Sequence, residues 1–387
     1  MVLVEISDWR LIGLELDGLG PFRQGSKRFD FYGVSHEGHD PRDAGPANLY
    51  MLLAANAHGK TTVLDTIYSL FGLMNYPATG RFSEPNAEGL AQLDIRSTWT
   101  IDGRTQTVLL SIWTGQEYPL QTWDADKLET DAQAGVWARL GLKMTTTGLV
   151  TLEETDELGR LLFGNILAMR DLPPSELFGL SQLMPSILYF PADRRMVPPS
   201  AAQSVTRPIG WGYQPAQLFG SDGPDWGTSI DNVLVWLEWL AVRDREGGDR
   251  RVDELLAFVN ELIFREDPTK EILPPTRELL KTFVRTAHGN HGLSALSHGE
   301  RAILQIIARV LTHMTTNTVV LVDEIDIHLH SRWMNRMFEA IKSLLRRYPA
   351  LSMILTTHNR ELIAAYDFET EENGLVKGGY IITDEMD

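Results

Sequence analysis

Residues 54–62, AANAHGKTT, have the types and spacing of a loop that holds phosphate. Such a loop curls backbone N–H groups around the anion at the start of a helix, while a lysine reaches the β and γ phosphates and a hydroxyl binds Mg²⁺. Gly59, Lys60 and Thr61 supply the second half of that pattern. Ala54 and Ala57 stand where glycines are usual, and a Cβ there costs about 1 kcal/mol in left-handed backbone. An apolar strand before the loop and a helical pattern after it favour a phosphate loop over a chance GKT triplet.

Two carboxylates follow a buried strand in the segment TNTVVLVDEID, residues 316–326. The four apolar residues 319–322 are typical of a strand covered on both faces in a parallel sheet. Ligands of such sheets bind at the carboxyl ends of the strands, where Asp323 and Glu324 would lie. We expect Asp323 to hold Mg²⁺ through water and Glu324 to take a proton from an attacking water. The plainer interpretation is an acidic loop, and the upstream phosphate loop weakens it.

A helix start and a histidine are the remaining positions of chemical interest. Ser297 followed by Glu300 has the capping-box pattern, ahead of a helix whose apolar residues fall on one face. Taken alone, this pattern predicts an ordinary capped helix. Further along, a short apolar strand within MILTTHNRELI ends just before His358. The sequence thus holds four motifs in order: phosphate loop, capped helix, acidic strand end and histidine.

The hydrophobic pattern predicts the elements that must position these residues. Residues 11–32 and 92–113 each indicate two strands joined by a turn. A strand near 187–190 ends in PADRR, and helices are expected at 151–170, 229–240 and 252–264. We expect an α/β fold with a mixed central sheet, an N-terminal antiparallel β subdomain, a helical insertion and no long coiled coil.

The predicted organisation has three parts. Residues 1–125 would form an N-terminal lobe with the phosphate loop and the β subdomain. Residues 126–285 would form a mainly helical insertion, with a Pro- and Gly-rich loop at 197–228. Residues 286–387 would form a C-terminal lobe that carries the other three motifs.

Composition limits the compartment and the partners. The chain has 387 residues, no cysteine and a formal net charge of −17. The lack of cysteine excludes disulfides, thiolate metal sites and a cysteine nucleophile, and it fits a reducing cytoplasm. Without a signal sequence or a run of about 18 apolar residues, the chain is expected to be cytoplasmic and to have no membrane partner. Its acidity repels phosphates, so contact with nucleic acid would need a local basic patch or a partner chain.

The order of the four motifs resembles that of ABC-type ATPase heads. Residues 296–300, LSHGE, are similar to the LSGGQ-type signature as it occurs in the SMC-like branch, and His358 stands where that superfamily has its switch histidine. The block DEIDIHLHSRW resembles the DE-x-x-x-HLHP-x-W block of OLD-like, AAA-annotated bacterial ATPases, many of them in anti-phage defence systems. The helix VLDTIYSLF after the phosphate loop is also similar to that of the recombination mediator RecF.

The resemblance implies a site for ATP and Mg²⁺ shared between two heads. Asp323 would support the metal together with Thr61, Glu324 would polarise water, and His358 would contact the γ-phosphate. The signature of one head would complete the nucleotide site of the other, so the chain would form a homodimer or higher homo-oligomer around ATP. The residues implied to bind nucleotide are Asn56, Ala57, His58, Gly59, Lys60, Thr61, Thr62, Ser297, Gly299 and Glu300.

Three smaller assignments stay open. His328 and His330 follow the acidic pair, and the resemblance implies a place at the dimer interface, with a metal site as the alternative. Asp193 to Arg195 form a surface turn or else contact a partner or nucleic acid. The glutamine that couples metal to the accessory lobe in this superfamily is not obvious, and Gln92 and Gln182 are the candidates.

Two classes of function remain. The first is a regulatory ATPase, slowed by Ala54 and Ala57, that controls a separate effector, a nuclease or toxin, in anti-phage defence. The second is a RecF-like repair ATPase that binds duplex DNA when ATP is bound. Charge favours the first, because the arginines that would form a DNA lane are mixed with acids. Too few residues follow His358 for a nuclease domain, so any nuclease would be a second protein.

Overall fold

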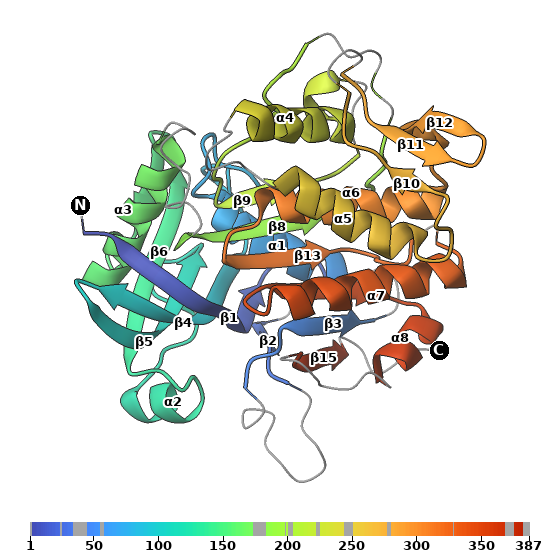
Figure 1. Cartoon of the computed structure of the whole chain (residues 1–387). Helices are drawn as coiled ribbons and strands as arrows, with labels where there is room; N and C mark the ends of the chain where they lie inside the picture. Colours follow the sequence, from blue (N-terminus) through green and yellow to red (C-terminus); the bar gives the residue numbers. More distant parts are fainter. Residues whose placement is uncertain are drawn as a thin grey trace.

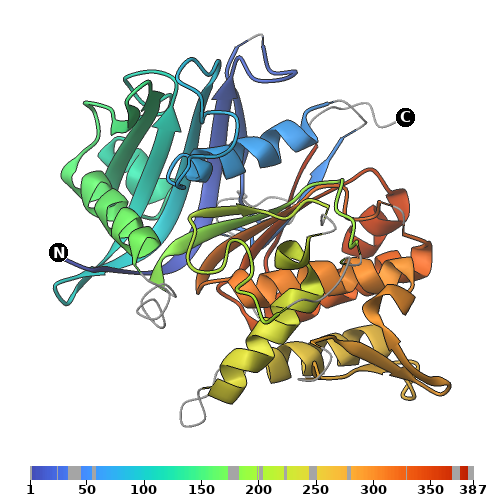
Figure 2. The same ribbon diagram turned by 90° about the horizontal axis from the view of Figure 1, so that it is seen from above.

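The computed structural model describes residues 2–23, 25–33, 45–54, 58–172, 183–197, 199, 204–221, 225–243, 251–276, 280–327, 329–367 and 375–381. Within them, two six-stranded sheets pack against opposite sides of helix α1 (Lys60–Gly72), and a third, three-stranded sheet completes the fold (Figure 1). Figure 2 shows α1 running between the strands of the two large sheets. The predicted α/β fold class is confirmed.

The first sheet holds both predicted hairpins. Its order is β2 (Lys27–Asp30), β1 (Val4–Asp17), β4 (Leu90–Ile101), β5 (Arg104–Thr114), β6 (Val136–Thr145) and β7 (Gly148–Thr151). Asp102 and Gly103 both have positive φ, as the turn between β4 and β5 requires. All pairs are antiparallel except β5 with β6. Helix α2 (Ala125–Thr130) follows β5, and α3 (Glu157–Asp171) packs against β6.

The second sheet is parallel throughout and carries the motifs. Its order is β15 (Lys377–Ile381), β3 (Leu49–Leu53), β14 (Ser352–Thr357), β13 (Asn317–Val322), β8 (Pro185–Phe190) and β9 (Ala216–Leu218). Alternate side chains enter different cores. In β3, Tyr50 and Leu52 join the core shared with α1 and the first sheet, whereas Leu49 and Met51 join the core on the other face. Because both faces are covered, these strands are continuous apolar runs.

Helices cover the second face of this sheet. They are α4 (Ile230–Arg243), α5 (Arg251–Phe264), α6 (His298–His313), α7 (Ser331–Arg347) and α8 (Arg360–Asp367). Two short 3₁₀ helices, η3 (Trp226–Thr228) and η4 (Leu293–Ala295), precede α4 and α6. The small sheet is β10 (Glu271–Ile272), β11 (Phe283–Thr286) and β12 (Gly289–Gly292). Among the described residues, α7 is the longest helix with 17 residues, and no helix has the length and apolarity to cross a membrane.

Residues 126–285, expected as a mainly helical part, contribute to all three sheets. Strands β6 and β7 extend the first sheet, β8 and β9 extend the second, and β10 and β11 belong to the third. Helices α3, α4 and α5 lie between these strands in the chain. The difference arises because short buried strands such as β8 are hard to recognise when their partners lie more than a hundred residues away.

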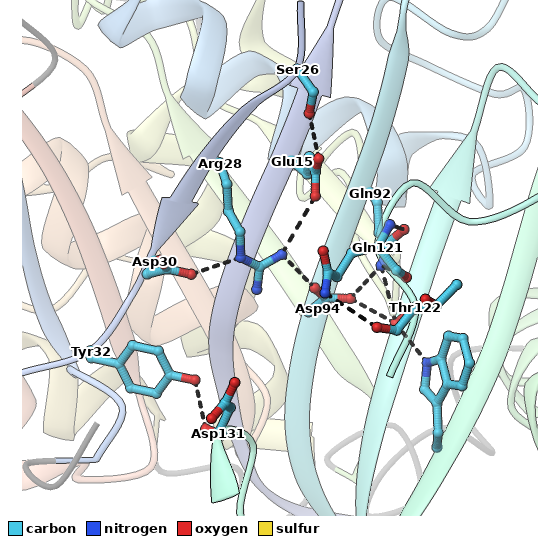
Figure 3. A network of polar contacts seen from close by, with 12 residues as sticks. Glu15, Ser26, Arg28, Asp30, Tyr32, Gln92, Asp94, Gln121, Thr122 and Asp131 are labelled. Atoms are coloured by element: carbon cyan, nitrogen blue, oxygen red, sulfur yellow. Dashed lines mark hydrogen bonds and ion pairs between the residues drawn. The ribbon is translucent and has the colours of Figure 1, made fainter. Parts of the chain in front are cut away.

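A buried polar network ties the strands of the first sheet together (Figure 3). Arg28 Nη1 donates to Asp94 Oδ2 at 2.9 Å, and its Nε donates to Asp30 Oδ1 at 2.8 Å. The other oxygen of Asp94 accepts from Gln92 at 2.8 Å and from Ser111 at 2.6 Å. Asp94 is fully buried, so its charge is balanced and hydrogen-bonded entirely by this network.

Candidate functional site

Four parallel strands of the second sheet end at one edge. Register pairs Leu53 with Thr357, Leu355 with Val322, and Val322 with Phe190. The loops that follow β3, β14, β13 and β8 therefore begin side by side. These loops carry the phosphate-loop residues, His358, the acidic pair and Asp193 to Arg195, respectively. The carboxyl edge of a parallel sheet is where such folds bind ligands, so we take this edge as the candidate site.

Lys60 begins α1 and is buried at this edge. Its Nζ donates to the carbonyl oxygen of Ala54 at 2.5 Å, so the side chain folds back over the end of β3. Burial lowers the pKa of Lys60, and the negative charges of Glu324, Asp323 and Asp326 oppose that shift. The ammonium group thus faces residues 323–326, which we call the acidic turn, across the start of α1. Asn56 and Ala57 lie outside the described residues, and His58 is exposed.

Gly59 is required by its surroundings. It has φ of +98°, and a Cβ would lie 2.5 Å from the ring of Phe22 and 2.8 Å from Pro21. The turn between β1 and β2 therefore packs on the first residues of α1. Gly20, in the same turn, also packs closely on α1, since a Cβ there would lie 2.7 Å from Thr62 Oγ1. A glycine at position 59 is thus set by both backbone angle and space.

Thr61 and Asp323 meet directly. Thr61 Oγ1 donates to Asp323 Oδ2 at 2.7 Å, although 262 residues separate them in the chain. Thr356 Oγ1, from the end of β14, donates to Asp323 Oδ1 at 2.6 Å. The carboxylate is 2% exposed, and its described partners are hydroxyl groups rather than cations. A hydroxyl and a carboxylate side by side are oxygen ligands of the kind that Mg²⁺ prefers.

Glu324 adopts a conformation that non-glycine residues rarely take. Its φ is +44°, in the left-handed region. Its backbone N–H donates to Thr356 Oγ1 at 2.7 Å, and the next N–H, of Ile325, donates to the carbonyl of Thr356 at 3.1 Å. Within the described part of the chain, the Glu324 carboxylate has no hydrogen-bond or ion-pair partner and is half-buried. The turn therefore presents this carboxylate beside Lys60 and Asp323.

The signature residues open α6, as the capping pattern predicts. Ser297 Oγ accepts from the N–H of Glu300, and Glu300 Oε2 accepts from the N–H of Ser297 at 2.6 Å. Lys270 binds the other oxygen of Glu300 at 2.6 Å, so this carboxylate is used within the protomer. Gly299 lies against α7, because a Cβ would lie 2.2 Å from the ring of Trp333. No hydrogen bond or ion pair between described residues joins the signature to Lys60, Thr61 or Asp323.

His358 follows β14 at the same edge and is exposed. Its neighbour Thr357 donates to Asp326 Oδ1 at 2.7 Å, and Asn359 Oδ1 accepts from the N–H of Glu361, in the first turn of α8, at 2.8 Å. The loop that carries His358 is therefore fixed on both sides. Of the two histidines after the acidic pair, His328 lies outside the described residues and His330 precedes α7. The described residues contain no group of three acidic or histidine side chains that would hold a metal.

Two residues at this edge, Thr356 and Thr357, are missing from the sequence prediction. The prediction names Arg194 but not the inward orientation of its side chain. The two threonines are polar residues that end an apolar strand, a signal that indicates a role at the edge. Of the two glutamine candidates, Gln92 belongs to the network of the first sheet, and Gln182 is outside the described residues. The loop after β8, next to the acidic turn, instead holds Asp193, Arg194 and Arg195.

A cavity of about 1050 Å³ adjoins the acidic turn. Residues of the loop after β8 form one wall, the first turns of α6 form a second, and Ile325, Ile327 and Leu329 form a third. Arg194 lines it together with His298 and Arg301. The signature helix and the acidic turn of one protomer are thus separated by open space.

Residues 238–364, about a third of the chain, match the protein family described as "AAA domain, putative AbiEii toxin, Type IV TA system". The chain is 34% identical over 95 residues to "Retron Ec83 probable ATPase" of Escherichia coli, which covers 22% of this chain and 17% of that protein. It is 27% identical over 135 residues to "Septu protein PtuA" of Bacillus mycoides (strain KBAB4), which covers 33% of this chain and 17% of that protein. Each match thus spans about a sixth of the relative's length.

Among solved structures, an SMC head bound to the C-winged helix domain of ScpA aligns with 92% of this chain and 92% of its own length, at 12% identity and a TM-score of 0.44. The family match contains Ser297, Asp323, Glu324 and His358, and it begins after Lys60 and Thr61. The resemblance seen in the sequence is confirmed to this extent: residues 238–364 match an AAA domain, and the chain has an α/β fold.

Proposed function

We propose that the chain binds ATP with Mg²⁺ at the carboxyl edge of the second sheet and hydrolyses it. The observation that carries this proposal is the 2.7 Å hydrogen bond between Thr61 Oγ1 and Asp323 Oδ2. It joins the start of α1 to the end of β13, and the charges of Lys60 and Glu324 interact at the same edge. Chance motifs would have no reason to converge at hydrogen-bond distance.

Each residue then has a distinct task. The first N–H groups of α1 and the Lys60 ammonium bind the phosphates, because a helix N-terminus and a cation both favour anions. Thr61 and Asp323 hold Mg²⁺, which would neutralise charge on the phosphates when bound. Glu324 orients the attacking water and accepts its proton. Lys60, whose Nζ donates to the carbonyl of Ala54, would reach a phosphate by a movement of its flexible side chain alone.

Dimerisation around the nucleotide follows from the position of the signature. The α6 N-terminus, with Ser297 and Gly299, has no contact with the phosphate loop of its own chain within the described residues. A second copy that approaches this edge would place that helix N-terminus against the bound nucleotide. Glu300 then supports the signature through its cap and through Lys270, and Ser297 and the helix N–H groups contact the phosphate.

The dimer is proposed to regulate a separate effector, a nuclease or toxin, in anti-phage defence. Two features support this: the DEIDIHLHSRW block, which resembles OLD-like ATPases of such systems, and the matches to a retron ATPase and to a Septu protein. The net charge of −17 argues against a clamp that encircles DNA on its own. ATP binding would hold the effector in one state and hydrolysis would release it.

Two substitutions test the ATPase. Lys60→Ala is expected to weaken ATP binding by about a hundredfold, because a charge-assisted contact to phosphate is lost. Glu324→Gln is expected to keep the binding affinity, abolish turnover and accumulate the ATP-bound dimer. Isothermal calorimetry, phosphate release and light scattering measure the three quantities. Lys127→Ala and Glu129→Gln, which change exposed residues of α2, serve as controls.

Contrary results would be clear. Unchanged affinity in Lys60→Ala would exclude a phosphate loop at residues 54–62, and normal turnover in Glu324→Gln would exclude Glu324 as the base. Pull-down from the native host with the Glu324→Gln chain tests for the effector. ATP-dependent binding of a 30-base-pair duplex by the purified chain alone would favour the RecF-like alternative instead.

A further inference from the structure

The loop after β8 turns one of its two arginines inward. The side chains of Asp193 and Arg195 are 81% and 68% exposed, and they form a surface ion pair at 3.8 Å. Arg194, between them, is half-buried and points toward the end of β13. The sequence alone does not distinguish the two arginines. The structure does, because β8 and β13 are paired and their following loops are in contact.

The guanidinium of Arg194 binds backbone rather than carboxylates. Its Nη1 donates to the carbonyl of Asp323 at 2.5 Å and to the carbonyl of Pro191 at 2.8 Å. Its Nη2 donates to the carbonyl of Glu324 at 2.9 Å. One rigid fork therefore joins two consecutive carbonyls of the acidic turn to the loop after β8.

Thr356 holds the opposite side of the same peptide units. Its hydroxyl accepts from the N–H of Glu324 and donates to Asp323, and its carbonyl accepts from the N–H of Ile325. The left-handed conformation of Glu324 is unfavourable for a residue with a Cβ and persists only where surrounding contacts impose it. Arg194 and Thr356 supply such contacts on the carbonyl side and the amide side, and the N–H of Ile327 also donates to the carbonyl of Glu324 at 3.0 Å.

Burial lowers the pKa of Arg194 to about 10, while the charges of Asp323, Asp326 and Glu324 raise it. The side chain is therefore charged at neutral pH. Because its N–H groups are used by carbonyls, its charge offsets the repulsion among the acidic residues without occupying their oxygens. The guanidinium therefore occupies no carboxylate oxygen of Asp323 or Glu324, and the oxygens of Asp323 accept from Thr61 and Thr356.

We propose that Arg194 is the positioning residue that holds Glu324 in its left-handed conformation and so aims its carboxylate for hydrolysis. The step from conformation to hydrolysis rests on the proposed ATPase function, whereas the clamp itself does not. Lysine would keep the charge but lacks the planar fork that reaches both carbonyls. Arg194 also lines the cavity in front of α6, so its N–H groups lie between the acidic turn and the signature helix.

The test compares Arg194→Lys and Arg194→Ala with the neighbouring control Arg195→Ala. Backbone hydrogen exchange of a peptide that spans residues 323–327 is measured in the nucleotide-free chain. We expect exchange at least about tenfold faster in Arg194→Ala, intermediate in Arg194→Lys and unchanged in Arg195→Ala, because the clamp protects these amides from local opening. In ATP turnover, Arg194→Lys should lower kcat about tenfold and leave KM within about twofold.

The outcomes separate the two proposals. If the unmodified chain does not hydrolyse ATP, the proposed function is wrong, and the exchange data still decide whether Arg194 clamps the turn. Equal exchange in Arg194→Ala and the unmodified chain would overturn the clamp. So would equal acceleration in Arg195→Ala, since that indicates a general disturbance of the loop. A higher KM with unchanged kcat would overturn the positioning role by making Arg194 a residue that binds substrate.

Discussion

Two buried aspartates of this chain have opposite surroundings. Asp94, in the first sheet, receives a guanidinium directly on its carboxylate, and amide and hydroxyl donors satisfy its second oxygen. Asp323, in the second sheet, accepts hydroxyl hydrogen bonds from Thr61 and Thr356, while the nearby guanidinium of Arg194 binds its backbone carbonyl. Both carboxylates are almost fully buried, at 0% and 2% exposure.

The two aspartates differ in whether the chain places a cation directly on the carboxylate. At Asp94 the protein supplies its own counter-ion, so the network is closed and joins strands. At Asp323 the guanidinium binds the backbone, and the described hydrogen-bond partners of the carboxylate are two hydroxyl groups. A buried carboxylate with only neutral donors is costly unless a ligand completes it. This contrast supports the proposed site at the second sheet without reference to any motif.

The largest expected effect is on stability, at the closed network. Asp94→Asn removes the counter-ion of Arg28 and should lower the free energy of unfolding by about 3 kcal/mol. ATP affinity should not change, because the network lies in the first sheet. Urea denaturation followed by tryptophan fluorescence measures the loss, with Asp30→Asn as a control at an exposed partner of the same guanidinium. A loss no larger than that of the control would mean that the network does not depend on Asp94.

The same change at Asp323, in the proposed nucleotide site that we call the open site, should affect turnover rather than stability. Asp323→Asn should lower kcat/KM for Mg-ATP by about a hundredfold, because a metal-binding charge is lost. The free energy of unfolding should stay within about 1 kcal/mol, since repulsion from Glu324 and Asp326 is relieved. Steady-state phosphate release and urea denaturation are the two measurements. A large loss of stability here would abolish the contrast with Asp94.

Much of the open site is predictable from local sequence, but the residues that support it, Arg194 and Thr356, are not. Lys60, Thr61 and Asp323 belong to short motifs whose chemistry depends on a strand end and a helix start, and the structure brings them together. Arg194 gains its position only through the pairing of β8 with β13, which joins residues more than a hundred positions apart. Thr356 likewise contacts Asp323 across two parallel strands. Such contacts depend on register, which no local pattern specifies.

The network around Asp94 shows the opposite error of sequence analysis, in which a structural residue is interpreted as functional. Gln92 attracts a functional interpretation because the resemblance to ABC-type heads implies a glutamine that couples metal to the accessory lobe. In the structure its amide donates to Asp94, and its oxygen accepts from the N–H of Gln121 at 2.9 Å. A polar side chain within an alternating strand has an ordinary explanation when a buried charge lies on the same face. That charge was visible in the sequence as Asp94, but its burial was not.

Two hydroxyl groups allow a finer comparison. Ser111 donates to Asp94 and Thr356 donates to Asp323, each at 2.6 Å. Ser111→Ala should lower the free energy of unfolding by about 1–2 kcal/mol and leave turnover unchanged. Thr356→Val should lower kcat about tenfold, because Glu324 loses the acceptor of its N–H, with less effect on stability than Ser111→Ala. If both variants lost stability alone, Thr356 would be structural like Ser111.

The smallest expected effect concerns His313, whose buried ring nitrogen Nε2 has no carboxylate partner among the described residues. His313, at the end of α6, lies against Trp211 and Phe219, and its Nε2 has no partner in the described part of the chain. Burial lowers its pKa to about 3, and the positive charges of Arg309 and Arg251 add to this.

The histidine is therefore neutral when folded but takes up a proton when unfolded below about pH 6.5. The unfolded state binds more protons between pH 6.5 and 3, so stability must fall as the pH drops through this window. Between pH 7.5 and 5.5 the loss from this one group is about 1 kcal/mol. His313→Gln should remove that part of the slope, measured by urea denaturation at each pH, with exposed His288→Gln as control. An unchanged slope would mean that His313 is protonated in the folded chain, and a buried cation without a counter-charge would then have to be explained by contacts beyond Trp211 and Phe219.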